Sequence, residues 1–130
     1  MNILQNNPYR LLGVYSNSPT KERLANHNRM KAFLKVGKSV SFPLDVPQYL
    51  SSINRTEASA ADAEAKLTLP KDQILHAQFW FIKTTPLDEV AFNHLFAGEI
   101  DKAEEIWQKR ECLSALQNRI VCALIRNRYD

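Results

Sequence analysis

The chain has 130 residues, 45% of them hydrophobic, and a formal net charge of +3. This length suits one domain, or one domain and part of another, with a core that removes about two thirds of the unfolded surface from water. No apolar run approaches the ~18 residues of a membrane helix and the N-terminal segment does not resemble a signal peptide, so we expect a cytoplasmic protein with no membrane contact. Glycine is scarce, strand-like alternation is nearly absent and capping residues recur, which predicts an all-α fold.

Capping residues mark where the predicted helices begin, and glycines mark where several of them end. Asn7-Pro8 has the form of an N-cap and first helical residue, and Gly13 that of a C-terminal stop. The same reasoning along the chain predicts seven helices, over about 8–12, 19–35, 55–68, 70–82, 86–97, 99–110 and 114–128. Residues 38–53 contain two prolines and fit no period, which predicts a long loop.

Two of the predicted helix starts have the spacing of a capping box. Asn54 with Glu57 is expected to cap the helix over about 55–68, and Ser114 with Gln117 the last helix. A narrow face of small residues on the first of these helices would allow close packing, and its members are Ala58, Ala61 and Ala65.

The segment over about 70–82 carries apolar residues on two sides of its predicted helix, including Ile74 and Leu75. A helix of this kind is expected to be buried between neighbours. Trp80 in this segment and Trp107 further on are interpreted as core residues rather than ligand-stacking residues.

Positive charge is concentrated in the first part of the chain. Residues 1–50 contain seven basic and two acidic side chains, and most of the excess lies in the helix over 19–35 and just beyond it. The candidate partner-binding residues are Lys21, Arg23, Arg29, Lys31 and Lys35. Such a face suits an acidic protein surface or nucleic acid, or is only a solvated helix face.

The stretch from Ala32 to Ser39, AFLKVGKS, is close to the phosphate-binding loop of ATPases and GTPases. That loop joins a strand to a helix, so that its amides and the helix N-terminus point at the phosphates. Here the preceding residues are helical in pattern and two prolines follow. The context argues against nucleotide hydrolysis, and Gly37 is interpreted as the end of the basic helix.

Other chemistry has little support in the sequence. The three histidines are scattered singly, without a partner at metal-ligand spacing, and no nucleophile motif accompanies the serines. The two cysteines are not spaced as CxxC and are expected to be reduced thiols. The chain is therefore predicted to be no enzyme, with no cofactor, no metal, no catalytic residue and no small-molecule substrate.

The first half of the chain resembles the J-domain of DnaJ-type co-chaperones. The opening NPYRLLGV, residues 7–14, is similar to the family's Y-x-x-L-G-V start, and a basic second helix follows. The alanine-rich segment from Ala58 to Asp72 is similar to its third helix, so the likeness extends over 7 to about 82.

One departure from that family bears on activity. J-domains carry His-Pro-Asp after the basic helix, and this tripeptide is needed to stimulate the Hsp70 ATPase. The corresponding place reads Lys35-Val36-Gly37, and the nearest echo, Phe42-Pro43-Leu44-Asp45, has no histidine. The resemblance thus implies the fold, and docking of the basic helix on an acidic Hsp70 surface, without the stimulation.

The second half resembles tetratricopeptide repeats. Leu95 to Trp107 is similar to the turn and second helix of such a repeat, with small Ala103 facing the neighbouring helix and Trp107 filling the groove. This implies a J-like domain over 1–83 and repeat-like helices over 84–130, expected to be the N-terminal part of a longer protein.

These observations lead to one functional hypothesis and its alternatives. The chain is expected to be a non-enzymatic protein-binding module, similar to a co-chaperone, with Hsp70 or a client protein as its partner. The alternative is a nucleic-acid-binding or structural helical module that uses the basic helix over 19–38. The acidic runs further along the chain count against nucleic acid, and a single aromatic residue, Phe33, lies among the basic ones.

Overall fold

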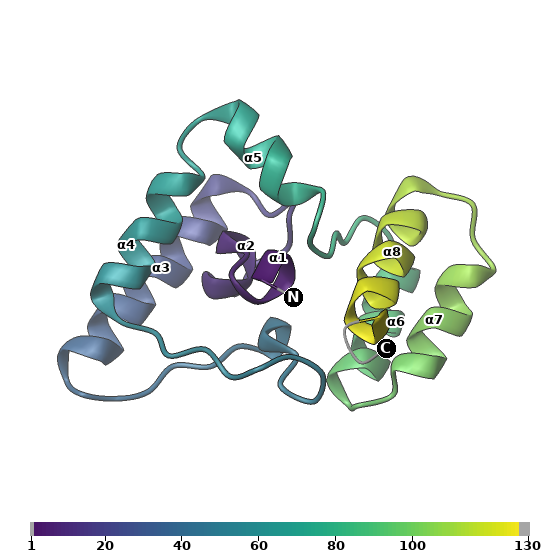
Figure 1. Cartoon of the computed structure of the whole chain (residues 1–130), viewed down its shortest axis with the longest axis horizontal. Helices are drawn as coiled ribbons and strands as arrows, with labels where there is room; N and C mark the ends of the chain where they lie inside the picture. Colours follow the sequence, from purple (N-terminus) through teal and green to yellow (C-terminus); the bar gives the residue numbers. More distant parts are fainter. Residues whose placement is uncertain (1, 128–130) are drawn as a thin grey trace.

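The computed structural model describes residues 2–127, and within this range it contains helices and connecting segments but no β-strand (Figure 1). The chain is therefore all-α, as the sequence predicts. Its elements are α1 (Asn2–Gln5), α2 (Pro8–Leu11), α3 (Thr20–Lys35), the 3₁₀ helix η1 (Pro43–Asp45), α4 (Glu57–Lys66), α5 (Pro70–Ala77), α6 (Pro86–Phe96), α7 (Ile100–Gln108) and α8 (Leu113–Asn127). No helix in the described range is long and apolar enough to cross a membrane. The predicted end of the last helix at 128 lies outside the described residues.

Helices α3 and α4 pack side by side and run antiparallel (Figure 1). Arg23, in the first turn of α3, pairs with Glu64 near the end of α4, with 3.0 Å between Nε and Oε1. At the opposite end, Arg55 lies just before α4 and its Nη1 donates to the carbonyl of Val40, 3.1 Å away. The long segment between the two helices thus leaves and returns at the same end of the pair, and α2 packs against α4 beside it.

Helices α6 and α7 form the antiparallel hairpin that the glycine between them predicts. Thr85 and Asp88 cap the start of α6, each side chain accepting a hydrogen bond from the backbone N–H of the other. At its end the Gly98 N–H donates to Leu95 and the Glu99 N–H to His94, with Gly98 at φ +82°. This pair of bonds closes the helix and turns the chain into α7, and α8 then packs against α7.

The buried side chains form one cluster that extends from the first helices to the last. Its centre is a chain of aromatic rings, in which the Phe81 ring centroid lies 5.1 Å from that of Trp80 and 5.4 Å from that of Phe92. Phe92 in turn lies 5.1 Å from Trp107. Trp80 and Trp107 are 0% and 1% exposed, which confirms the prediction that both are core residues.

The prediction of a buried helix over 70–82 was wrong. Helix α5 ends at Ala77, has no buried residue, and leaves Ile74 and Leu75 64% and 54% exposed. The chain then continues without helix, and it is this segment that carries Trp80 and Phe81 into the core. Side chains from elsewhere bond to the carbonyls at this point: Asn7 Nδ2 donates to His76, and Gln117 Nε2 donates to Ala77 and Trp80. Tertiary contacts therefore end the helix where its pattern would continue.

Two predicted capping boxes and one packing face were also wrong. Helix α4 is capped by Thr56 with Ser59, not by Asn54 with Glu57, because Arg55 is held in the interior before the helix begins. The side chain of Gln117 bonds to the end of α5 instead of capping α8, which begins at Leu113. The buried face of α4 is formed by Ala60, Ala63 and Leu67, which lie two residues further along the chain than the predicted face. The predicted residues Ala58, Ala61 and Ala65 are exposed.

The two predicted units contact each other through several side chains. The Tyr49 hydroxyl, in the segment between α3 and α4, donates to the Gly98 carbonyl at 2.6 Å and accepts from the Ile100 N–H at 3.2 Å. The rings of Tyr15 and Phe92 lie 4.8 Å apart. The division into two domains at residue 83 stays a prediction. Buried side chains from both sides of it belong to one core.

Candidate functional site

Four of the five predicted partner-binding residues are exposed on α3, and one is not. Arg23 is 7% exposed and is held against Glu64 of α4, so it belongs to the packing between the two helices. His27 lies on the same side, with Nδ1 3.9 Å from the second oxygen of Glu64. The exposed residues are Lys21, Arg29, Lys31 and Lys35.

Three of these form a stripe along α3. At 100° per residue, Lys21, Lys31 and Lys35 lie within an arc of roughly 80°. None of the three has an ion-pair partner among residues 2–127, whereas Arg23 is neutralised internally. The half-exposed Leu24 lies on the same arc, 44% exposed. We call Lys21, Lys31 and Lys35 the lysine stripe.

Arg29 belongs to a different part of the surface. Its guanidinium lies over the ring of Phe33, 5.6 Å from the centroid, and the Lys38 ammonium lies 6.0 Å from the same centroid. Both contacts are of the cation–π type, which is modest at exposed sites. The basic residues of α3, together with Lys38, thus fall into three groups. These are the lysine stripe, the two cations at the Phe33 ring, and the buried pair of Arg23 with Glu64.

The backbone after α3 excludes a phosphate loop at AFLKVGKS. Gly37 adopts φ +76°, its N–H donates to the Leu34 carbonyl, and the Lys38 N–H donates to the Phe33 carbonyl. These amides close the helix and are not free to bind phosphate. They lie at a helix C-terminus, whose partial charge is negative and repels anions. Gly37 is therefore the helix end that the sequence indicates.

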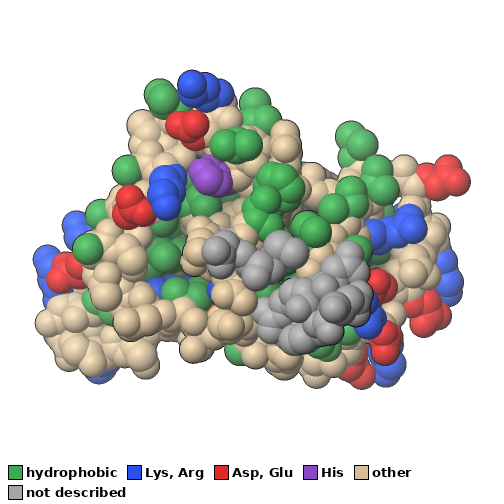
Figure 2. All heavy atoms as spheres, viewed as in Figure 1, with side chains coloured by type: hydrophobic (Ala, Val, Ile, Leu, Met, Phe, Trp, Pro, Cys, Tyr) green, Lys and Arg blue, Asp and Glu red, His purple; other side chains and the backbone are tan. Residues whose placement is uncertain are grey.

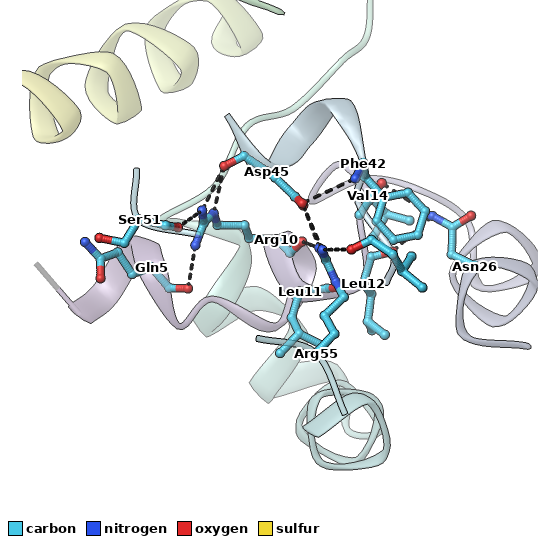
Figure 3. Close-up of polar contacts among 12 residues, drawn as sticks. Gln5, Arg10, Leu11, Leu12, Val14, Asn26, Phe42, Asp45, Ser51 and Arg55 are labelled. Atoms are coloured by element: carbon cyan, nitrogen blue, oxygen red, sulfur yellow. Dashed lines mark hydrogen bonds and ion pairs between the residues drawn. The ribbon is translucent and has the colours of Figure 1, made fainter. Parts of the chain in front are cut away.

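The segment after α3 is held by two buried arginines that meet at Asp45 (Figure 3). Arg55, 6% exposed, binds the Asp45 carboxylate with both terminal nitrogens, at 2.6 and 2.8 Å. Arg10, 1% exposed, donates to the Asp45 carbonyl at 2.8 Å and to the carbonyls of Gln5 and Ser51. Arg55 also donates to the carbonyls of Leu11 and Arg10. We call Arg10, Asp45 and Arg55 the arginine network.

Phe42-Pro43-Leu44-Asp45, the echo of His-Pro-Asp, has Leu44 and Asp45 buried, Phe42 half-buried and Pro43 exposed. The Phe42 ring lies under the Arg55 guanidinium, 5.0 Å from its carbon, and against the backbone of Gly13. Asp45 is buried, with its side chain 11% exposed, and besides Arg55 its carboxylate accepts from the Phe42 N–H. The acidic group of the tetrapeptide, the Asp45 carboxylate, is therefore bound to Arg55 rather than presented to a partner.

The network was not predicted from the sequence. Arg10 lies within the NPYRLLGV motif and Arg55 in a predicted helix, and an arginine at either place is ordinarily a surface residue. The one hint in the sequence was Asp45, which lies two residues after Pro43 in a segment with little other charge. That signal indicates a turn, but not the partners 10 and 35 residues away.

No group of three or more histidine, cysteine or acidic side chains within residues 2–127 is arranged to hold a metal. Asp88 is a buried acid: burial acts to raise its pKa, but hydrogen bonds from the Thr84 backbone, Trp107, Ser114 and the Thr85 backbone outweigh this and lower it. The Asp88 side chain thus caps the start of α6.

Comparison of the chain with models of known protein families, with curated proteins and with solved structures finds no match.

Proposed function

We propose that this chain is a non-enzymatic protein-binding module, a degenerate J-like unit joined to repeat-like helices, which binds an acidic protein surface through α3. The observation that supports this best is the lysine stripe. Its three ammonium groups share one face and have no internal ion-pair partner within residues 2–127. Exposed charges arranged in this way contribute to steering and orientation of an oppositely charged partner.

The antiparallel pair α3–α4, with a long connection at one end, is compatible with the J-like reading. An Hsp70-type chaperone is the partner class that this reading favours. The ATPase of that chaperone is not expected to be stimulated, because the Asp45 carboxylate is bound by Arg55 and its side chain is only 11% exposed. The module would then hold or position its partner without driving its cycle.

The test is a binding titration against the organism's own Hsp70 at low and at physiological salt. The double variant Lys31→Glu/Lys35→Glu should weaken binding by up to about thirtyfold, since it removes two exposed pairs that are each worth up to ~1 kcal/mol. Lys71→Glu/Lys109→Glu makes the same charge change at exposed positions outside α3 and should bind like the unmodified chain. Binding should also weaken as salt screens the charges.

Three results would contradict the proposal. Equal loss in both double variants would show that net charge acts rather than the stripe. Stimulation of ATP turnover to the level of a true J-protein would show that the locked Asp45 does not matter. Tighter, stripe-dependent binding to a single-stranded RNA would favour the nucleic-acid alternative.

A further inference from the structure

Helix α8 presents an apolar stripe to solvent on the side away from the core. Leu113, Leu116 and Ile120 are 84%, 50% and 48% exposed and follow the i, i+3, i+7 spacing of one helix face. The opposite face is buried through Val121 and Ile125. Figure 2 shows hydrophobic side chains gathered over the N-terminal half of α8 and extending toward α5. Single exposed apolar residues are ordinary, but a continuous row of them marks an interaction surface.

The stripe borders a groove between α7 and α8. Leu116 and Ile120 line this groove, which has a volume of about 280 Å³, together with Ala123 and the α7 residues Glu104 and Gln108. The small side chain of Ala123 keeps its C-terminal part open. A groove between two packed helices is the shape that receives the side-chain ridge of a third helix.

The charged side chains around the groove differ in whether they form ion pairs. Glu104 is paired with Arg126, Nε to Oε1 at 2.5 Å, and Arg126 also bonds to Asp101. Arg119 lines the groove and has no ion-pair partner within residues 2–127. The groove therefore combines an apolar floor with one cation, Arg119, that has no ion-pair partner among the described residues, while Glu104 and Asp101 share Arg126.

We propose that this groove binds an amphipathic α-helix of a protein partner, with a carboxylate beside its apolar face that pairs with Arg119. This is the helix-in-groove mode of recognition, with apolar anchors at i, i+3 and i+7 and a charge that sets the orientation. The groove lies at the far end of the molecule from α3, so it is a second site, independent of the lysine stripe (Figure 1).

A second copy of the chain fits the groove less well. In an antiparallel pairing of two α8 helices, Leu116 would face Ile120 of the other copy, with the symmetry axis close to Asn118. That register places the two copies of Arg119 side by side, and like charges at such a position oppose association. A helix that brings a carboxylate does not meet this repulsion.

The experiment uses two synthetic helical peptides that carry leucines at i, i+3 and i+7 and differ only in the flanking residues, glutamate in one and lysine in the other. We expect the glutamate peptide to bind the full chain at least about tenfold more tightly, as measured by fluorescence anisotropy. Ile120→Asp should abolish this binding, and Arg119→Glu should reverse the preference between the peptides. Ile74→Asp, which places the same charge at an exposed apolar residue of α5, should leave the affinity unchanged.

A control variant on α3 tests whether the peptide binds at the groove. Lys31→Glu/Lys35→Glu should not affect the glutamate peptide, and loss of binding in that variant with retention in Ile120→Asp would place the peptide on α3 and overturn the proposal. Failure of the glutamate peptide to bind at millimolar concentration, or a preference between the peptides that Arg119→Glu does not change, would also overturn it. So would sedimentation that shows a dimer disrupted by Ile120→Asp.

Discussion

Arg55 grips Asp45 with two parallel hydrogen bonds, Nη2 to Oδ1 at 2.6 Å and Nη1 to Oδ2 at 2.8 Å, and both residues are buried. A pair of this geometry fixes orientation as well as distance. It joins the 3₁₀ helix after α3 to the residue just before α4, so it determines how the long connection is folded.

Asp45→Asn should therefore destabilise the chain strongly. The change leaves the Arg55 guanidinium buried without its counter-charge, which typically costs about 3–5 kcal/mol in the free energy of unfolding. Urea denaturation followed by tryptophan fluorescence measures it. Asp62→Asn is the matched control, because Asp62 pairs with Lys66 on the surface of α4 and its loss should cost less than about 1 kcal/mol. Similar losses in both variants would contradict the buried role of the network.

Gly13→Ala should be more harmful than Gly37→Ala. Both glycines have positive φ, +71° and +76°, so each substitution carries the left-handed backbone cost of roughly 1–2 kcal/mol. A Cβ at Gly13 would also lie 2.3 Å from Cγ of Phe42, whereas one at Gly37 meets nothing within 4 Å. The difference in unfolding free energy between the two variants should be about 1–3 kcal/mol.

A double variant tests whether contact with Phe42 causes the loss of stability in Gly13→Ala. Combining Gly13→Ala with Phe42→Ala should give less than the sum of the two single losses, because the second change removes the atoms that clash. Additive losses would show that Phe42 does not confine Gly13.

Asp88→Asn should lower stability at neutral pH and change its pH dependence. The pKa of Asp88 is lowered from its usual 3.8, since hydrogen bonds from the Thr84 backbone and Trp107 to the carboxylate outweigh the opposing effect of burial. A carboxyl with a lowered folded pKa stabilises the fold above its unfolded pKa, and this contribution is lost as pH falls below about 4 and through the folded pKa. Wild type should exceed the variant by about 1–3 kcal/mol at pH 7, with the gap narrowing below pH 4. Glu111→Gln, an exposed acid, should show no such change of gap.

The two thiols should react at very different rates in the native protein. Hydrogen bonds from Ser114 and from the backbone of Ala115 lower the pKa of the exposed Cys112 thiol, whereas burial raises that of Cys122. A thiol-specific chromogenic reagent should label one cysteine per folded chain and two in denaturant. Cys112→Ser should remove the fast reaction, while Cys122→Ser should keep it. Rapid labelling of both sites without denaturant would contradict the packing of α8.

Helix ends that depend on contacts within a few residues were predictable from the sequence where no distant side chain intervened, unlike the starts of α4 and α8. Gly37 and the Thr85–Asp88 box fix helix ends through contacts within a few residues, and the predicted boundaries there agree with the structure to within one or two residues. The end of α5 was not predictable, because the side chain of Gln117 that bonds to its carbonyls lies 40 residues away from Ala77.

The candidate site divides in the same way. Lys21 and Arg23 are equivalent in a list of basic residues, and both lie in the first turn of α3. Only the approach of Glu64, 41 residues further along the chain, makes Arg23 part of the interior and leaves Lys21 on the surface. A charge pattern can thus identify a basic helix, but the face it presents depends on what packs against it.

The arginine network also has a kinetic consequence. Arg55 and Asp45 are only 10 residues apart, but several other bonds of the network join residues 35 to 45 apart, such as Arg10 with Asp45 and Arg55 with Arg10. The α6–α7 hairpin, in contrast, closes within a few residues around Gly98. Closing a long loop costs more entropy than closing a short one, so the hairpin is expected to form early and the network late. Changes within the network should then accelerate unfolding and leave the refolding rate nearly constant in stopped-flow experiments. The network would thus act as a kinetic latch, which determines how long the folded chain persists rather than how quickly it forms.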